Sequence, residues 1–154
     1  MRAGTRLAAA LAFLWTGLAA FSAVGQQAAA VGSVNLKLDG CTLVVSRPDF
    51  RRSFDLLAPS ACDFHRNRDQ SLRVVTFRGR EVLIVESARR GSAAQPNAGP
   101  GGCETRLFPV VLNSSDVVVL TEPIAVAACP PFRWDEKVFT AAAEKAIEMR
   151  AGER

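Results

Sequence analysis

Residues 72–87, LRVVTFRGREVLIVES, contain the pattern that decides the fold. Two runs rich in β-branched and other apolar residues, LRVVTF and EVLIVES, lie on either side of Arg78-Gly79-Arg80. Gly79 can adopt the positive φ of a tight turn because it has no Cβ atom. The segment therefore predicts an antiparallel β-hairpin.

Further hairpins are expected on both sides of this segment. From Ser33 onward, apolar and polar residues alternate with the period of a half-buried strand, and Asp39-Gly40 is a strong two-residue turn. Asn113-Ser114-Ser115-Asp116 marks another turn between two apolar runs. The expected strands cover residues 34–38, 42–46, 54–57, 72–77, 81–87, 104–112, 116–120 and 124–128.

The C-terminal segment has a helical pattern instead. Asp135 is a good N-cap, and Trp134 before it with Phe139 after it has the spacing of a hydrophobic staple. One helical face collects Val138, Phe139, Ala142, Ala143, Ala146 and Met149. We expect an amphipathic helix over 135–150 that packs on the sheet, with a partner-binding helix as the alternative.

Together these patterns predict a mainly β (α+β) fold. Antiparallel hairpins would form a small sandwich or a half-open barrel, with one C-terminal amphipathic helix packed on it. A single domain, 33–154, would contain all of these elements. Residues 26–32 are small and polar and are expected to form a flexible leader, and SAAQPNAGPGG at 92–102 is expected to be a mobile loop.

The first 25 residues are typical of a secretory signal peptide. Arg2 and Arg6 give a positive start, an uncharged apolar stretch follows, and Ala23-Val24-Gly25 places small side chains before a cleavage site. An uncleaved anchor helix is the alternative, but no cluster of Lys or Arg follows the stretch. We expect a periplasmic or extracellular protein that has no transmembrane anchor after signal cleavage.

The four cysteines of the chain are expected to form two disulfides, because their number is even and the chain is exported. Each consecutive pair brackets two apolar runs separated by a turn, and an antiparallel hairpin would bring such flanking cysteines close together. We therefore expect Cys41–Cys62 and Cys103–Cys129, each worth about 3 kcal/mol. A metal site is disfavoured, since the chain has no CxxC motif and a single histidine.

His65 is the only histidine and the natural centre of any catalytic site. Asp63 would lie on the same face of a strand, where its carboxylate could orient the imidazole as a general base. A lone histidine in a loop is more often simply solvated. The sequence contains no GxSxG elbow, P-loop or GxGxxG fingerprint, so we expect no cofactor. A small periplasmic hydrolase centred on Asp63 and His65 is therefore the alternative function.

Arginines are concentrated between residues 47 and 90, and guanidinium groups bind carboxylates and phosphates through two parallel hydrogen bonds. Four of them are the candidate contacts for a protein or an anionic envelope component, because both pairs are expected in loops beside the first disulfide. These residues are Arg51, Arg52, Arg66 and Arg68. Acidic residues in the same segment make a solvated surface the alternative.

Nucleic acid is not expected as a partner. The net charge of +4 falls to about +2 without Arg2 and Arg6, and no aromatic platform alternates with the arginines. We expect an exported, soluble binding or accessory module of the cell envelope, such as an inhibitor, an adaptor or a partner subunit. A purely structural envelope protein is a third possibility, and Asn113-Ser114-Ser115 fits a glycosylation acceptor whose use depends on the host.

Overall fold

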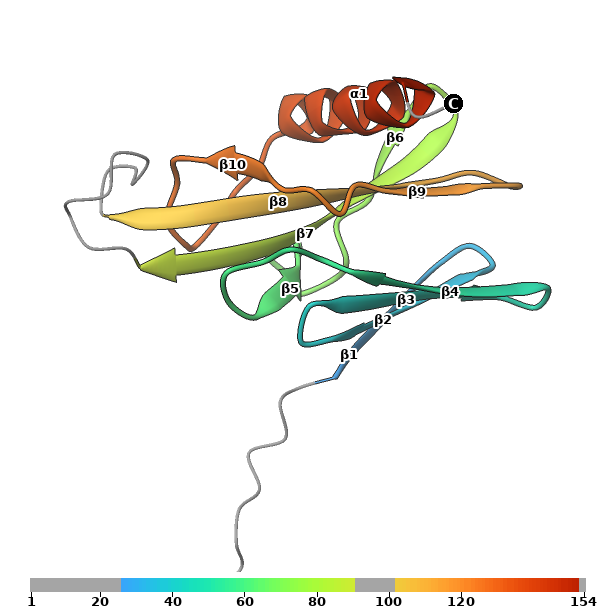
Figure 1. The fold of residues 1–154 in the computed structure, drawn as a ribbon, viewed down its shortest axis with the longest axis horizontal. Helices are drawn as coiled ribbons and strands as arrows, with labels where there is room; N and C mark the ends of the chain where they lie inside the picture. The colour runs from blue at the N-terminus through green and yellow to red at the C-terminus, as the bar shows by residue number, and fades with distance from the viewer. Residues whose placement is uncertain (1–25, 91–101, 153–154) are drawn as a thin grey trace, which may run out of the picture.

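The computed structural model describes residues 26–90 and 102–152. They form three layers: a four-stranded sheet (sheet A), a six-stranded sheet (sheet B), and a helix on the outer face of sheet B (Figure 1). The predicted mainly β fold with a C-terminal helix is confirmed. The expected signal peptide at 1–25 lies outside the described residues, and so does the expected loop at 92–102 apart from Gly102.

Sheet A is an antiparallel meander in which each strand pairs with the next along the chain. Glycines at positive φ, Gly32 at 57° and Gly40 at 59°, form the first two turns. The strands are β1 (Gln27–Val31), β2 (Val34–Asp39), β3 (Thr42–Arg47) and β4 (Phe50–Asp55).

The flexible leader expected at 26–32 is wrong, because this segment contains β1. Its backbone pairs with β2, with Ala29 opposite Leu36 and Val31 opposite Val34. Val31 is buried and Ala29 packs against the core. Alanine has a weak intrinsic strand preference, so the ladder to β2 and the contact with the core stabilise this strand.

The loop expected around Arg51 and Arg52 is also wrong. Both residues lie on β4, where Arg51 is opposite Ser46 and Arg52 is opposite Val45. The strand is exposed except at Phe50 and Phe54, which are half-buried. A polar edge strand of this kind resembles a loop in sequence.

Sheet B contains the hairpin of the opening segment, β6 with β7. Arg78 and Gly79 both adopt positive φ at its turn, 50° and 70°. The strand order is β10-β8-β7-β5, with β6 also paired to β7 and β9 also paired to β8. The strands are β5 (Cys62–Phe64), β6 (Val75–Phe77), β7 (Arg80–Arg90), β8 (Cys103–Leu112), β9 (Val117–Val119) and β10 (Ile124–Val126).

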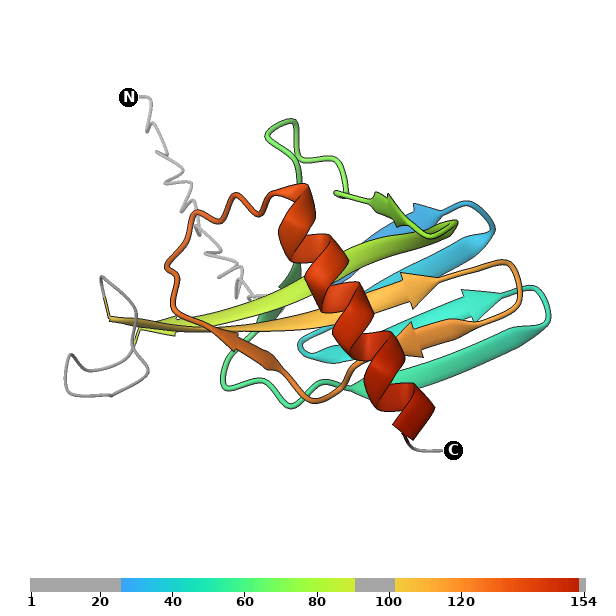
Figure 2. The ribbon, with the colours of Figure 1, turned by 90° about the horizontal axis from the view of Figure 1, so that it is seen from above.

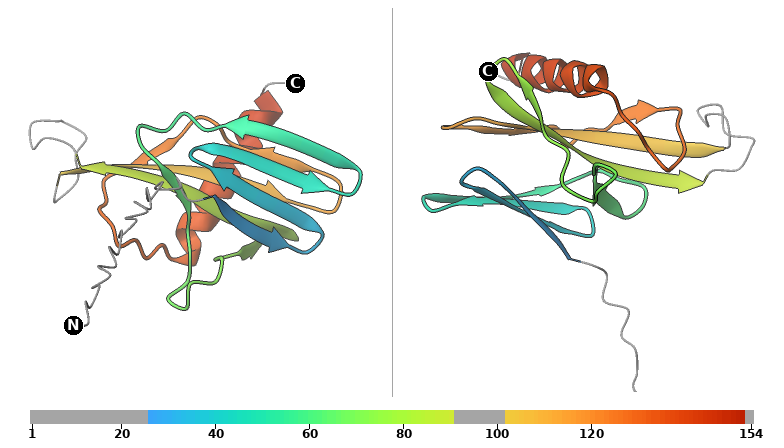
Figure 3. Two further views of the ribbon diagram at one scale, coloured as in Figure 1. Left: turned by 90° about the horizontal axis from the view of Figure 1, so that it is seen from below. Right: turned by 180° about the vertical axis from the view of Figure 1, so that it is seen from behind.

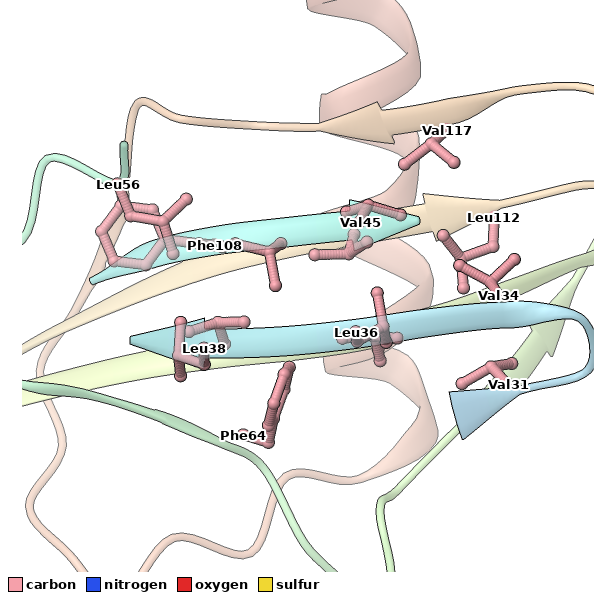
Figure 4. Packing of buried hydrophobic residues seen from close by; sticks show 14 of the residues in the cluster. Val31, Val34, Leu36, Leu38, Val45, Leu56, Phe64, Phe108, Leu112 and Val117 are labelled. Atoms are coloured by element: carbon pink, nitrogen blue, oxygen red, sulfur yellow. The ribbon is translucent and has the colours of Figure 1, made fainter. Parts of the chain in front are cut away.

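The long strands β7 and β8 are buried on both faces, so sheet B separates two apolar cores. Toward sheet A, alternate residues such as Leu83 and Phe108 pack among the side chains shown in Figure 4. Toward the helix, the intervening residues such as Ile84 and Val111 form the second core. From below, sheet A covers only part of sheet B, and β7 and β8 extend beyond it (Figure 3).

The helix α1 (Glu136–Gly152) crosses β7 and β8 diagonally (Figure 2). Asp135 caps it, since its Oδ1 accepts a hydrogen bond from the backbone N–H of Val138 at 3.1 Å. Four residues of the predicted apolar face are buried, Phe139, Ala142, Ala143 and Ala146, and the other two, Val138 and Met149, are half-buried. Within the described parts of the chain, no helix is both long and apolar enough to cross a membrane.

The two disulfides are Cys41–Cys62 and Cys103–Cys129, the pairs expected from the sequence. The second disulfide lies at one end of the antiparallel β8–β10 ladder, where a hairpin was expected to bring its two cysteines together. The first has a different geometry, because it joins the β2–β3 turn of sheet A to β5 of sheet B. Two disulfides in so small a domain indicate an oxidising, exported environment.

Candidate functional site

A cavity of about 770 Å³ lies on the helix side of sheet B, beside the start of α1. Its floor includes Asp63 of β5 and Glu86 of β7, and its walls are the segment 65–73 and the connector 130–134. The connector leads from the second disulfide into the helix. Because α1 begins only at Glu136, it leaves this end of the sheet uncovered.

His65 sits at the centre of a buried polar cluster. The residue is 3% exposed, and its Nδ1 lies 3.1 Å from Oε2 of Glu86. Trp134 donates its indole N–H to the same oxygen at 2.8 Å. The imidazole ring also lies 5.8 Å from the ring of Phe139, measured between centroids. Glu86 therefore joins three segments of the chain at the floor of the cavity.

The sequence prediction paired His65 with Asp63, and the structure brings both to the cavity. The partner of the imidazole is nevertheless Glu86, 21 residues away in the chain, and not Asp63. Trp134, 48 residues from Glu86 in the chain, was predicted only as part of the hydrophobic staple of the helix, and not as a residue of this site. Asp63 and Glu86 lie opposite each other on β5 and β7, so the same pair of strands brings both carboxylates to the cavity.

Asp63 differs from Glu86 in that its side chain is exposed and has no hydrogen bond or ion pair with any described residue. An ionised carboxylate is an acceptor only, with room for several donors. The floor of the cavity thus presents one carboxylate that holds the protein together and one that is open to the cavity.

Four arginines line the walls: Arg66, Arg68, Arg73 and Arg133. Within residues 26–90 and 102–152, none of them forms a salt bridge with a carboxylate. Arg66 donates to the backbone oxygen of Gln70 at 2.9 Å, and the guanidinium of Arg73 lies 5.5 Å above the Phe139 ring. Four guanidinium groups against two carboxylates give the lining a net positive charge.

One wall is aromatic. Phe132 and Trp134 stack with their ring centroids 5.0 Å apart and their planes inclined by 16°. Both residues are half-buried, so each ring is partly accessible. The hydrogen bond from Trp134 to Glu86 fixes the position of this wall relative to the floor.

The four arginines proposed from the sequence do not form one site. Arg66 and Arg68 line the cavity, whereas Arg51 and Arg52 lie on β4. Arg52 instead borders a smaller cavity of about 280 Å³, beside β9 and the end of α1. Arg133 had no distinguishing signal in the sequence, since only the fold brings the connector next to residues 65–73.

The cavity has a limited set of reactive groups. Its lining, as far as the structure describes it, contains no Ser, Thr, Cys, Lys or Tyr side chain. No group of three or more potential metal ligands occurs among the described residues. The site can therefore bind anions, accept hydrogen bonds at its floor and stack flat groups on its wall. No family model, curated protein or solved structure matches this chain.

Proposed function

We propose that this protein is an exported binding module of the cell envelope, periplasmic or extracellular, which binds a ligand with anionic groups in the cavity above β5 and β7. One observation carries the proposal: four arginines that have no carboxylate partner among the described residues face a single cavity. The disulfides and the signal-like first 25 residues support a role outside the cytosol.

The state of these arginines favours a ligand-binding role over that of a solvated surface. Surface arginines commonly pair with neighbouring acidic residues, as Arg89 does with Glu104 at 2.8 Å. On the floor of the cavity, Glu86 is already bonded to His65 and Trp134, and Asp63 forms no salt bridge with any described arginine. Guanidinium groups in this state can form charge-assisted hydrogen bonds with carboxylate or phosphate oxygens of a ligand.

The hydrolase centred on Asp63 and His65 remains the second candidate. It is favoured by the carboxylate–imidazole pair of Glu86 and His65 in a concave site. Among the described residues the lining offers no hydroxyl, thiol or amine nucleophile, so the attacking group would be the carboxylate of Asp63 or a water molecule activated by Asp63 or His65. The side chain of His65 is only 4% exposed, which fits a structural role better.

Nuclear magnetic resonance of the ¹⁵N-labelled protein tests the binding proposal, because it detects weak association. Citrate, inorganic phosphate and glucuronate are titrated separately, and the indole N–H of Trp134 and the Nε–H of Arg73 are followed. At least one anion should shift both signals saturably, and higher salt should weaken its binding.

A matched pair of variants locates the effect. Arg68→Ala with Arg133→Ala should weaken binding of that anion by about ten-fold or more, since two charge-assisted contacts are lost. Arg51→Ala with Arg52→Ala removes the same charge from β4 and should change the affinity for that anion by less than about two-fold. Equal losses in the two variants, or no saturable shift with any of the three anions, would overturn the proposal.

A further inference from the structure

We infer that the ligand of this cavity is an acidic saccharide, a chain of sugar rings that carry carboxylates. The inference rests on the proposed anion-binding function and names the class of ligand. Three features of the cavity carry it: the open carboxylate on the floor, the aromatic wall, and the arginines around them, which form no salt bridge with any described residue.

The floor argues against a ligand that is anionic throughout. Asp63 has no hydrogen-bond or salt-bridge partner among the described residues, and it lies opposite Glu86 in the ladder. Two carboxylates side by side repel phosphate or a polyanionic peptide, but an exposed carboxylate accepts hydrogen bonds from hydroxyl groups. A suitable ligand therefore places uncharged donors over the floor and its anionic groups against the arginines.

The aromatic wall fits the flat face of a ring. Phe132 and Trp134 present a stacked, half-buried pair next to the floor. The C–H groups on one face of a pyranose ring can lie against such a surface while its hydroxyls point sideways. Aromatic surface of this kind supplies contact area, and a few polar groups supply orientation.

The edge of β5 argues against an extended peptide. A peptide strand would need free backbone N–H and C=O groups along that edge. The backbone N–H of Phe64 is directed to the side-chain oxygen of Gln27 of β1, at 3.4 Å. Arg73 donates its backbone N–H to the carbonyl of His65 at 3.1 Å. The N–H of Phe64, the N–H of Arg73 and the carbonyl of His65 are thus already used within the domain.

The size of the cavity agrees with this class. Its volume of about 770 Å³ lies within the range of about 300–1,000 Å³ that is usual for sites of small ligands. The arginines come from both walls, since Arg66 and Arg68 precede β6 and Arg133 lies in the connector. Carboxylates on neighbouring sugar rings can therefore bind to either side.

Tryptophan fluorescence reports directly on the site. The chain has two tryptophans, Trp15 and Trp134, so Trp15→Phe leaves a single reporter on the cavity wall. The full chain with this substitution is titrated with trigalacturonate. Maltotriose, a neutral chain of the same length, is the main control, and triglutamate, adenosine monophosphate and inorganic phosphate represent other classes. Trigalacturonate should bind at least about ten-fold more tightly than each of them.

Two substitutions at one position test the role of the wall. Phe132→Leu keeps an apolar side chain but removes the flat ring, and should weaken trigalacturonate binding by about five-fold or more. Phe132→Tyr keeps the ring and should bind like the parent. If both variants bind like the parent, the stacking argument is wrong and the inference falls.

The controls separate this inference from the proposed function. Comparable binding of maltotriose overturns the inference because the carboxylates of the saccharide would not be recognised. Tighter binding of triglutamate, adenosine monophosphate or phosphate overturns the saccharide class. In the last three cases an arginine-dependent anion site would still exist, so the proposed function would stand. If neither trigalacturonate nor any other anion changes the Trp134 signal and the resonance titrations are also negative, both proposals are overturned.

Discussion

The helix side of sheet B has two halves that share the same strands but differ in chemistry. Along one face of β7, Val82 and Ile84 lie under α1 and are fully buried, whereas the next two residues, Glu86 and Ala88, line the cavity. The change coincides with the start of the helix at Glu136. Where the helix begins thus decides which part of the strand is core and which part is site.

The two halves are also held together differently. The covered half depends on close packing, with Phe139, Ala142 and Ala143 against the sheet. The open half depends on directed polar contacts, in which one carboxylate oxygen of Glu86 serves both His65 and Trp134. We therefore expect substitutions in the covered half to affect stability most, and those in the open half to affect binding most.

The largest effect is expected for Phe139→Ala in the covered half. The ring is fully buried, and its removal should lower the free energy of unfolding by about 3–5 kcal/mol through lost burial and a cavity. Phe132→Ala in the open half is the matched control, and should lower it by no more than about 1.5 kcal/mol. Urea unfolding measures both, and similar losses would show that the two halves do not differ in this way.

An intermediate effect is expected for Glu86→Ala. The substitution leaves the indole N–H of Trp134 and the buried imidazole of His65 without their shared acceptor, which should lower the free energy of unfolding by about 1–3 kcal/mol. Asp63→Ala removes the opposite carboxylate, which has no described partner, and should change it by less than about 0.5 kcal/mol. An equal loss for Asp63→Ala would contradict the assignment of structural and open carboxylates.

The smallest effect is expected on the other face of sheet B, at Glu104. Hydrogen bonds from Arg106, and then from Arg89, hold the pKa of this carboxyl below its ordinary value. A carboxyl group whose pKa is lower in the folded protein stabilises the fold at pH values above its pKa in the unfolded chain. This contribution is lost as the pH falls through the pKa of the folded protein. Glu104→Gln should therefore lower the melting temperature slightly at neutral pH.

Acid titration of the melting temperature checks the sign of this effect. The difference between parent and Glu104→Gln should shrink as the pH drops below the ordinary range of a glutamate, because the parent then loses the same interaction. A difference that persists unchanged in acid would mean that the substitution acts through something other than the charge.

The elements that the sequence predicted are those with local signals. The β6–β7 hairpin follows from two apolar runs around Gly79, and the start of α1 follows from Asp135 as N-cap. The cysteine pairs were also predicted, although only Cys103–Cys129 lies along one antiparallel ladder. For the hairpin and the helix start, the residues that decide the structure are close together in the chain.

The rest depends on contacts that the sequence does not display. Strand β1 is alanine-rich and exists because β2 pairs with it, and β4 has too few apolar residues to stand out. In the cavity, Glu86 meets His65 only after β5 has paired with β7, and Trp134 reaches them only after the connector has packed on sheet B. Sequence therefore identified four of the residues around this site, Asp63, His65, Arg66 and Arg68, but not how His65 is connected to Glu86 and Trp134.

The order of the disulfides has a consequence for how the chain matures. Each cysteine is bonded to its nearest neighbour in sequence, first Cys41 with Cys62 and then Cys103 with Cys129. A polypeptide that emerges N-terminus first into an oxidising compartment exposes the two members of each native pair in succession. An oxidase that simply joins thiols as they appear would produce the correct bonds, with little need for an isomerase to rearrange them.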